Sequence, residues 1–135
     1  MRKGFTLVET ITSIIIISMI IIIAMPAYNG IDKTIKETTY NNKIKSIESA
    51  TLKYANEYWL DEIKPEECLS NCFKCYELYN DIVAKGVYLA ETTDDNDGTP
   101  KINNPITNRK LDGYIKLTFT IEDASLSAEF VTDCE

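Results

Sequence analysis

Residues 5–27 form an almost uninterrupted apolar run that contains two blocks of four isoleucines. About 20 apolar residues in a helix are enough to cross the hydrocarbon core of a bilayer. The run therefore predicts a membrane-spanning helix. Arg2 and Lys3 precede it, and the positive-inside rule keeps such cations in the cytoplasm. We therefore expect the chain after Tyr28 to lie outside.

A helical period continues after the apolar run, but with many more charged residues between the apolar ones. The apolar side chains of this half fall near one stripe of a helix: Ile31, Ile35, Ile44, Ile47, Tyr54 and Tyr58. The pattern predicts one stem helix over residues 5–60, with a membrane half at 5–27 and an amphipathic half at 28–60. Pro26 should interrupt it, because proline lacks the backbone N–H and clashes with the preceding turn.

The last part of the chain alternates strictly between apolar and polar residues. Ile115, Leu117 and Phe119 are separated by single polar residues, and residues 126, 128 and 130 repeat the alternation after a turn at 122–125. A period of two predicts an antiparallel β-hairpin with one apolar face. That face can cover the helical stripe, so the expected fold class is α+β: a long N-terminal helix packed on a small antiparallel sheet.

The segment between stem and hairpin gives weaker signals. Helical spacing predicts a short helix over residues 76–85, with Gly86 as its C-terminal stop. Residues 87–90 suggest one strand. Residues 91–112 are polar and contain two prolines, which is typical of a long surface loop. Together with the hairpin, these segments make a globular head over residues 61–135.

Glu9 is the exception within the apolar run. An unpaired carboxylate costs about 2.5 to 3.5 kcal/mol at the centre of a bilayer. Glu9 must therefore either find a partner or reach back to the membrane surface.

Residues 4–9 read Gly-Phe-Thr-Leu-Val-Glu, follow a short basic segment and open the apolar run. This arrangement resembles the class III leader of type IV prepilins. The resemblance implies that prepilin peptidase removes residues 1–4 as a leader, cuts between Gly4 and Phe5, and methylates Phe5. It also implies that Glu9 pairs with the N-terminal amine of a neighbouring subunit. Pro26 matches the proline that kinks or melts the stem in pilin filaments.

The function implied by the resemblance is that of a structural subunit, major or minor, of a type IV pilus. The protein would sit in the cytoplasmic membrane as a single-pass monomer. The pilus assembly machinery would then polymerise it, alone or with other pilins, into a surface filament for adhesion or twitching motility. The alternative within the superfamily is a pseudopilin of a type II secretion or competence system. An alternative of another class is a single-pass membrane protein with a metal-binding head.

All four cysteines fall on the predicted exported side: Cys68, Cys72, Cys75 and Cys134. An even number in a small exported head predicts two disulfides. The spacing leaves the connectivity open, although Cys134 must pair with one of the other three. Pilins commonly pin their C-terminal segment with a single disulfide, so a second pair departs from that plan. Four thiolates holding a structural zinc ion are the alternative, and a redox pair at positions 72 and 75 is a third possibility.

Composition narrows the function further. The formal net charge is −7, which disfavours nucleic acid as the main partner. There is no histidine, the usual general base and a common metal ligand, and we therefore expect neither an enzyme nor a cofactor. The acidic segment 94–98 does not fit an EF-hand, because position twelve of such a loop would be Asn104 instead of glutamate. We expect a solvated turn there.

Overall fold

The computed structural model describes residues 6–63, 71–94 and 97–134, without the side chains of residues 27 and 29. Two helices come first, α1 and α2, then strand β1, a π-helix η1, and strands β2 to β5. Their bounds are α1 Leu7–Tyr58, α2 Leu60–Ile63, β1 Cys72–Glu77, η1 Leu78–Val83, β2 Thr92–Thr93, β3 Pro100–Lys101, β4 Tyr114–Thr120 and β5 Ser125–Val131. The chain divides into two units, Met1–Thr38 and Thr39–Glu135, which we describe separately.

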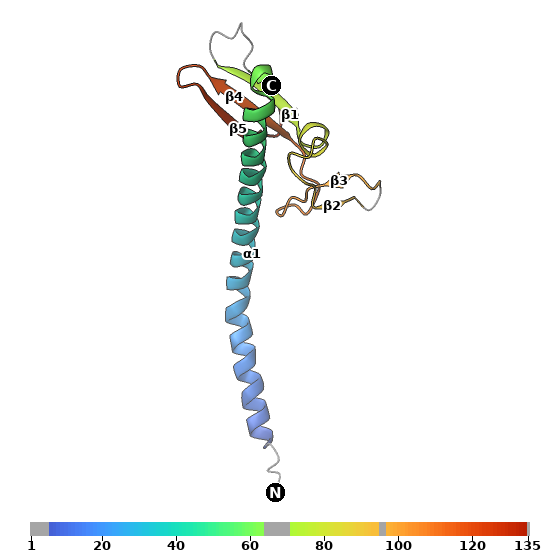
Figure 1. The fold of residues 1–135 in the computed structure, drawn as a ribbon. Coiled ribbons are helices and arrows are strands. Elements are labelled where there is room, and N and C mark those ends of the chain that lie inside the picture. The colour runs from blue at the N-terminus through green and yellow to red at the C-terminus, as the bar shows by residue number, and fades with distance from the viewer. Residues whose placement is uncertain (1–5, 64–70, 95–96, 135) are drawn as a thin grey trace. The chain divides into compact units, whose positions relative to one another are not determined.

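In the first unit the described residues form the N-terminal part of α1 (Figure 1). This helix is long and apolar enough to cross a membrane, with a mean hydropathy of 2.5 over its most apolar 18 residues. None of that window is buried inside the structure, whereas the core helix of a soluble protein would be mostly covered. The interruption expected at Pro26 is not seen, because α1 runs through this residue. A proline removes one helical hydrogen bond, and the turns on either side keep theirs.

The second unit contains a three-stranded antiparallel sheet in the order β1-β4-β5 (Figure 1). Strands β4 and β5 form the expected hairpin, with Ile115 opposite Phe130 and Thr118 opposite Ser127. The turn between them places Ala124 at φ 53°, in the left-handed region. The expected fold class is confirmed: the C-terminal part of α1 packs against this small sheet.

The core lies between α1 and the inner face of the sheet. On α1 the fully buried residues include Ile47, Thr51 and Ala55, each four positions after the last. Thr51 and Ala55 are small enough to let the strands approach the helix. The hydroxyl of Thr51 donates to the carbonyl of Ile47 at 2.8 Å, so its burial leaves no polar atom unpaired.

Half of the predicted stripe contributes to this core. Ile47 is buried, and Ile44 and Tyr54 pack against the core while half-buried. Ile31, Ile35 and Tyr58 are instead more than half exposed. The sheet contributes Tyr76, Ile115, Leu117 and Phe119, and the segment around the sheet contributes Leu78, Ile82, Ile102 and Leu111.

The predicted helix over residues 76–85 is correct only in part. Its first two residues belong to β1, which pairs with β4 from Cys72 opposite Phe119 to Glu77 opposite Tyr114. Helical structure begins at Leu78 and takes the wider π form, in which the N–H of Ala84 bonds to the carbonyl of Tyr79. The helical segment ends before Gly86, whose φ of 71° suits a stop.

The strand predicted at residues 87–90 is wrong, and the loop predicted at 91–112 is partly structured. Residues 87–90 form no strand, because the side chains of Val87 and Tyr88 turn against the core. Within the loop, β2 and β3 pair at Thr92 and Lys101. A backbone hydrogen bond of 2.8 Å joins the N–H of Leu111 to the carbonyl of Ile102, and both side chains are buried.

Gly113 allows a close approach of the sheet backbone, and Gly113→Ala should lower the free energy of unfolding by about 1 to 3 kcal/mol. A Cβ at this position would lie 2.5 Å from Cζ of Phe130 and 2.8 Å from the carbonyl oxygen of Val131. Denaturant unfolding of the full chain in detergent measures the change. Gly30→Ala is the matched control, since a Cβ there meets nothing within 4 Å. Equal stability of the two variants would contradict the close packing.

Candidate functional site

The start of α1 carries a reciprocal capping box. One carboxylate oxygen of Glu9, Oε2, accepts from both the backbone N–H and the hydroxyl of Thr6, each at 3.1 Å. The hydroxyl of Thr6 in turn accepts from the backbone N–H of Glu9 at 3.4 Å. Such a box satisfies donors that would otherwise be left unpaired at a helix start. The second oxygen, Oε1, has no partner among the described residues.

The remaining polar side chains of the apolar part of α1 bond within their own helix. Four hydroxyls donate to a carbonyl of the turn before, at 2.7 to 3.1 Å: those of Thr10, Thr12, Ser13 and Ser18. Glu9 is the only aspartate, glutamate, lysine or arginine between positions 6 and 31. It is therefore the single group in this stretch that still requires a partner of opposite charge.

The structure describes some of the residues expected from the resemblance and not others. Gly4 and Phe5 lie outside the described residues, so their processing stays a prediction. Glu9 lies in the first turn of α1, and Pro26 lies inside the same helix and is exposed. The capping box itself was missed, although its signature, threonine followed three residues later by glutamate, is plain in the sequence.

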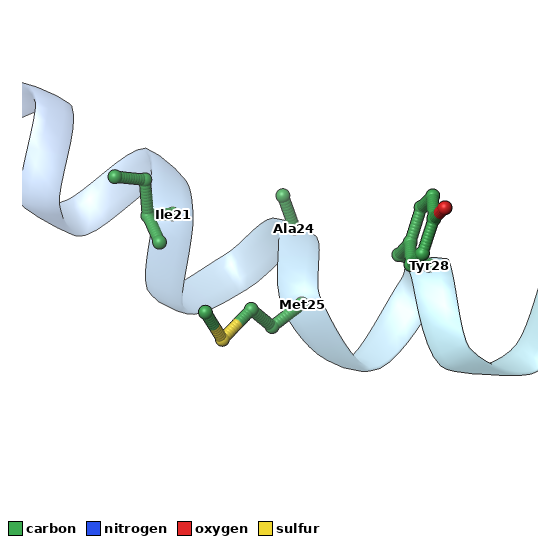
Figure 2. A pocket seen from close by; sticks show the side chains of 4 residues that line it. All are labelled: Ile21, Ala24, Met25 and Tyr28. Atoms are coloured by element: carbon green, nitrogen blue, oxygen red, sulfur yellow. The ribbon is translucent and has the colours of Figure 1, made fainter.

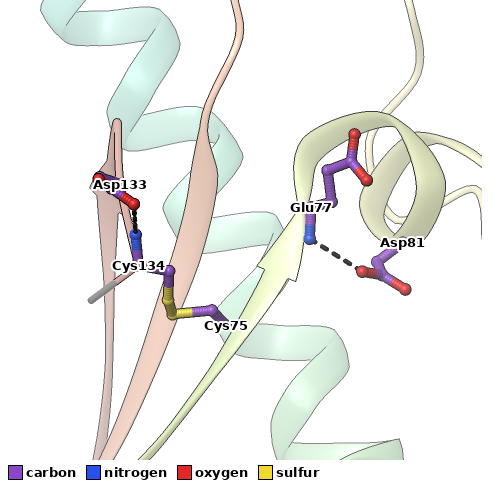
Figure 3. The surroundings of a disulfide bond; sticks show 5 residues. All are labelled: Cys75, Glu77, Asp81, Asp133 and Cys134. Atoms are coloured by element: carbon purple, nitrogen blue, oxygen red, sulfur yellow. Dashed lines mark hydrogen bonds between the residues drawn. A yellow bond between two sulfur atoms is a disulfide. The ribbon is translucent and has the colours of Figure 1, made fainter.

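A disulfide joins Cys75 on β1 to Cys134, three residues beyond the end of β5 (Figure 3). The two Cα atoms are 6.3 Å apart and 59 positions apart in the sequence. Because β4 lies between β1 and β5, the bond ties the two outer strands of the sheet together. The C-terminal segment is thereby held to the middle of the head.

Cys72 is also disulfide-bonded, and Cys68 lies outside the described residues. In this oxidised form Cys75 and Cys134 carry no thiolate, so the zinc alternative requires that their bond be absent. Positions 72 and 75 both belong to β1, where three residues span about 10 Å and point to opposite faces. That separation exceeds the reach of a disulfide, so these two cysteines do not form a redox pair in this conformation.

Lys43 on α1 clamps the loop that follows η1. Its Nζ lies 2.8 Å from both carboxylate oxygens of Glu91 and donates to the carbonyl of Asn103 at 2.6 Å. The Lys43 side chain is only 13% exposed. Tyr79 also bonds to this loop: its hydroxyl donates to the carbonyl of Leu111 at 2.8 Å and accepts from the N–H of Ile102 at 3.2 Å.

An aromatic cluster covers the C-terminal end of α1. Trp59 stacks on Tyr76 with ring centroids 4.0 Å apart, and Tyr54 packs edge-on against Trp59 at 4.9 Å. Burial, with the nearby Glu62 carboxylate second, raises the pKa of Tyr76 well above its usual value. The hydrogen bond from Lys74 lowers the pKa of Glu62. Both tyrosine and glutamate therefore keep their ordinary charge states near neutral pH.

In the acidic turn, the carboxylate of Asp97 accepts hydrogen bonds from a residue of the same turn. Oδ1 of Asp97 accepts from the N–H and the hydroxyl of Thr99 at 2.9 and 2.7 Å, and this hydroxyl lowers the pKa of Asp97. Residues 95 and 96 lie outside the described chain. Among the described residues, no group of three or more candidate ligands is placed to hold a metal ion.

These features together define a class of architecture: a long N-terminal apolar helix, packed on an antiparallel sheet, with a disulfide that fixes the C-terminal segment. This architecture is pilin-like. Comparisons with protein-family models, curated proteins and solved structures find no match to the chain.

Removing the disulfide by the double change Cys75→Ser and Cys134→Ser should lower the free energy of unfolding by about 4 kcal/mol, from the entropy of the released loop. Denaturant unfolding under oxidising conditions measures the loss. The reference is wild-type protein with a reductant, which should lose at least as much. A double variant as stable as the oxidised wild type would show that the bond does not constrain the head.

Lys43→Met should lower the free energy of unfolding by about 2 kcal/mol, because it leaves a carboxylate and a backbone carbonyl without their donor. Hydrogen exchange should rise most at the amides of residues 91–103. Lys53→Met is the matched control, since Lys53 is exposed on the same helix and makes no ion pair with any described residue. Equal exchange in both variants would argue against the clamp.

Proposed function

We propose that this chain is a structural subunit, major or minor, of a type IV pilus. The observation that carries the proposal is the first unit: every described side chain of its apolar helix is exposed, and one carboxylate interrupts the apolar surface near the start. Such a helix needs lipid or other apolar helices around it. In a filament, a core of bundled helices would surround each apolar helix with other apolar helices. This packing would require no change in the head.

In this proposal Glu9 sets the register in which neighbouring subunits dock in the filament. A buried carboxylate is costly unless it is paired, so a neighbouring N-terminal amine would relieve it on docking. The geometry supports this role, since Thr6 occupies only Oε2 and leaves Oε1 open to a further donor. A carboxylate has about four lone-pair positions, so it can keep its cap and accept an ammonium together. The capping box would thus orient the carboxylate before a partner arrives.

The partners and location follow from the same proposal. Prepilin peptidase would cleave between Gly4 and Phe5 and methylate Phe5. The subunit would wait as a single-pass protein of the cytoplasmic membrane, with the chain after Tyr28 outside. The assembly machinery would then transfer it to a surface filament that serves adhesion or twitching motility.

Glu9→Ala should leave the protein processed and in the membrane but lower its incorporation into filaments by about tenfold or more, since loss of a buried ion pair exceeds 1.4 kcal/mol. Immunogold labelling of sheared surface filaments, in cells with the assembly machinery, measures incorporation.

Thr12→Val is the matched control. It removes a polar group from the same helix whose hydroxyl already bonds to the carbonyl of Val8 at 2.7 Å. Incorporation should be unchanged. If Glu9→Ala were incorporated as well as the wild type, the docking pair would be wrong. If the wild type labelled no filament at all, the pilus function would be wrong.

A further inference from the structure

The exposed face of α1 carries a seam with a period of seven residues. Counting from Leu7 in steps of three and four gives an apolar side chain at every position except Thr10: Leu7, Thr10, Ile14, Ile17, Ile21, Ala24, Tyr28, Ile31 and Ile35. A spacing that averages 3.5 residues is the pattern of helices that pack side by side along their length. The seam continues beyond the membrane-spanning run, through Tyr28, Ile31 and Ile35.

The seam has the shape of a packing surface as well as the pattern. Ile21, Ala24, Met25 and Tyr28 line a hollow of about 420 Å³ on the helix (Figure 2). Their spacing of three, four and seven residues is that of the four-residue hole that receives a side chain from a facing helix. Ala24 is the smallest of the four.

Charges are kept off the seam and cancel one another. Asp32 pairs with Lys36 at 2.7 Å, and Lys33 lies 3.9 Å from Glu37. All four residues lie at positions of the seven-residue period other than those of the seam. Two copies of the helix can therefore approach along the seam without opposing like charges.

The driving force for this contact lies just outside the bilayer. Within lipid, apolar side chains gain nothing from the hydrophobic effect when helices meet. A span of about 20 residues that begins near Leu7 ends near Pro26. Tyr28 then lies at the interface, and Ile31 and Ile35, which are 56% and 58% exposed, lie in water. Covering them with the same residues of a second copy removes apolar surface from water.

We propose that two copies of this chain pair through this seam in the membrane, parallel and in register, before any filament forms. The shared membrane topology makes the helices parallel. Glu9 lies two positions after Leu7, on another face of the helix, so pairing leaves its carboxylate free for a different contact. The inference shares with the proposed function only the insertion of α1 into a membrane.

The test is oxidative cross-linking of the full chain in phosphatidylcholine vesicles, at low protein density and without assembly machinery. Ile31→Cys and Ile35→Cys place single thiols on the seam. Lys33→Cys places one on the opposite face of the same turns, and the wild type shows the background from the native cysteines. Disulfides form only between Cα atoms within about 7 Å, so the seam variants should give at least about tenfold more dimer than Lys33→Cys.

A second change tests the energetics. Adding Ile31→Ala to Ile35→Cys should weaken dimerisation by about tenfold, because each copy loses buried methyl and methylene groups. Adding Lys33→Ala should leave it unchanged. Equal cross-linking at positions 31, 33 and 35 would mean non-specific crowding. No cross-linking at all would mean that lipid and water alone cover the seam. Either result overturns the pairing.

The result separates this inference from the pilus proposal. Seam dimers in vesicles together with no labelled filaments on cells would remove the pilus function and keep the pairing. Labelled filaments together with no seam dimers would remove the pairing and keep the pilus function. Glu9→Ala should form seam dimers as well as the wild type does, because Glu9 lies off the seam.

Discussion

The chain makes more apolar helical surface than it can cover by itself. In residues 6–38 every described side chain is exposed, and most of those up to Met25 are aliphatic. Burial of such a surface is the largest favourable contribution available to a protein, and here it must come from outside the chain. In the proposed arrangement lipid covers the part that spans the bilayer, and the same residues of a second copy cover Ile31 and Ile35. The function of the molecule therefore depends on what this helix meets.

The head shows how a small domain stays folded with a modest core. Its sheet has three strands, and its buried helical positions include the small residues Thr51 and Ala55. A domain of this size buries a limited share of its surface, and links outside the core become important. The Cys75–Cys134 bond joins the outer strands, and Lys43 joins the loop to α1. These links fix the C-terminal segment and the loop whose Ile102 and Leu111 side chains belong to the core.

The sequence predicts the elements that carry their own periodicity and misses those that depend on a partner. The alternation at Ile115, Leu117 and Phe119 predicted β4, and a long apolar run predicted α1. Strand β1 has no such alternation: Cys72 and Lys74 share a face with Tyr76, and pairing with β4 decides its structure. The spacing of the aromatic residues suggested a helix there instead. The cysteine spacing likewise left the pairing of Cys134 open, because connectivity depends on which strands are neighbours.

The candidate site was predictable as a residue but not as an arrangement. A lone carboxylate in an apolar run identifies Glu9 from sequence, whereas the division of work between its two oxygens requires coordinates. Oε2 belongs to the helix start and Oε1 remains available. The seam lies on another face of the helix from Glu9 and carries no charge. Different interactions would therefore stabilise contacts at the seam and at Glu9. Apolar pairing along the seam is strongest where water reaches the helix, and ionic pairing at Glu9 is strongest where lipid excludes water. In the proposed assembly, one helix can therefore hold a neighbour at the membrane surface while the Glu9 carboxylate, placed in lipid, still awaits a second partner.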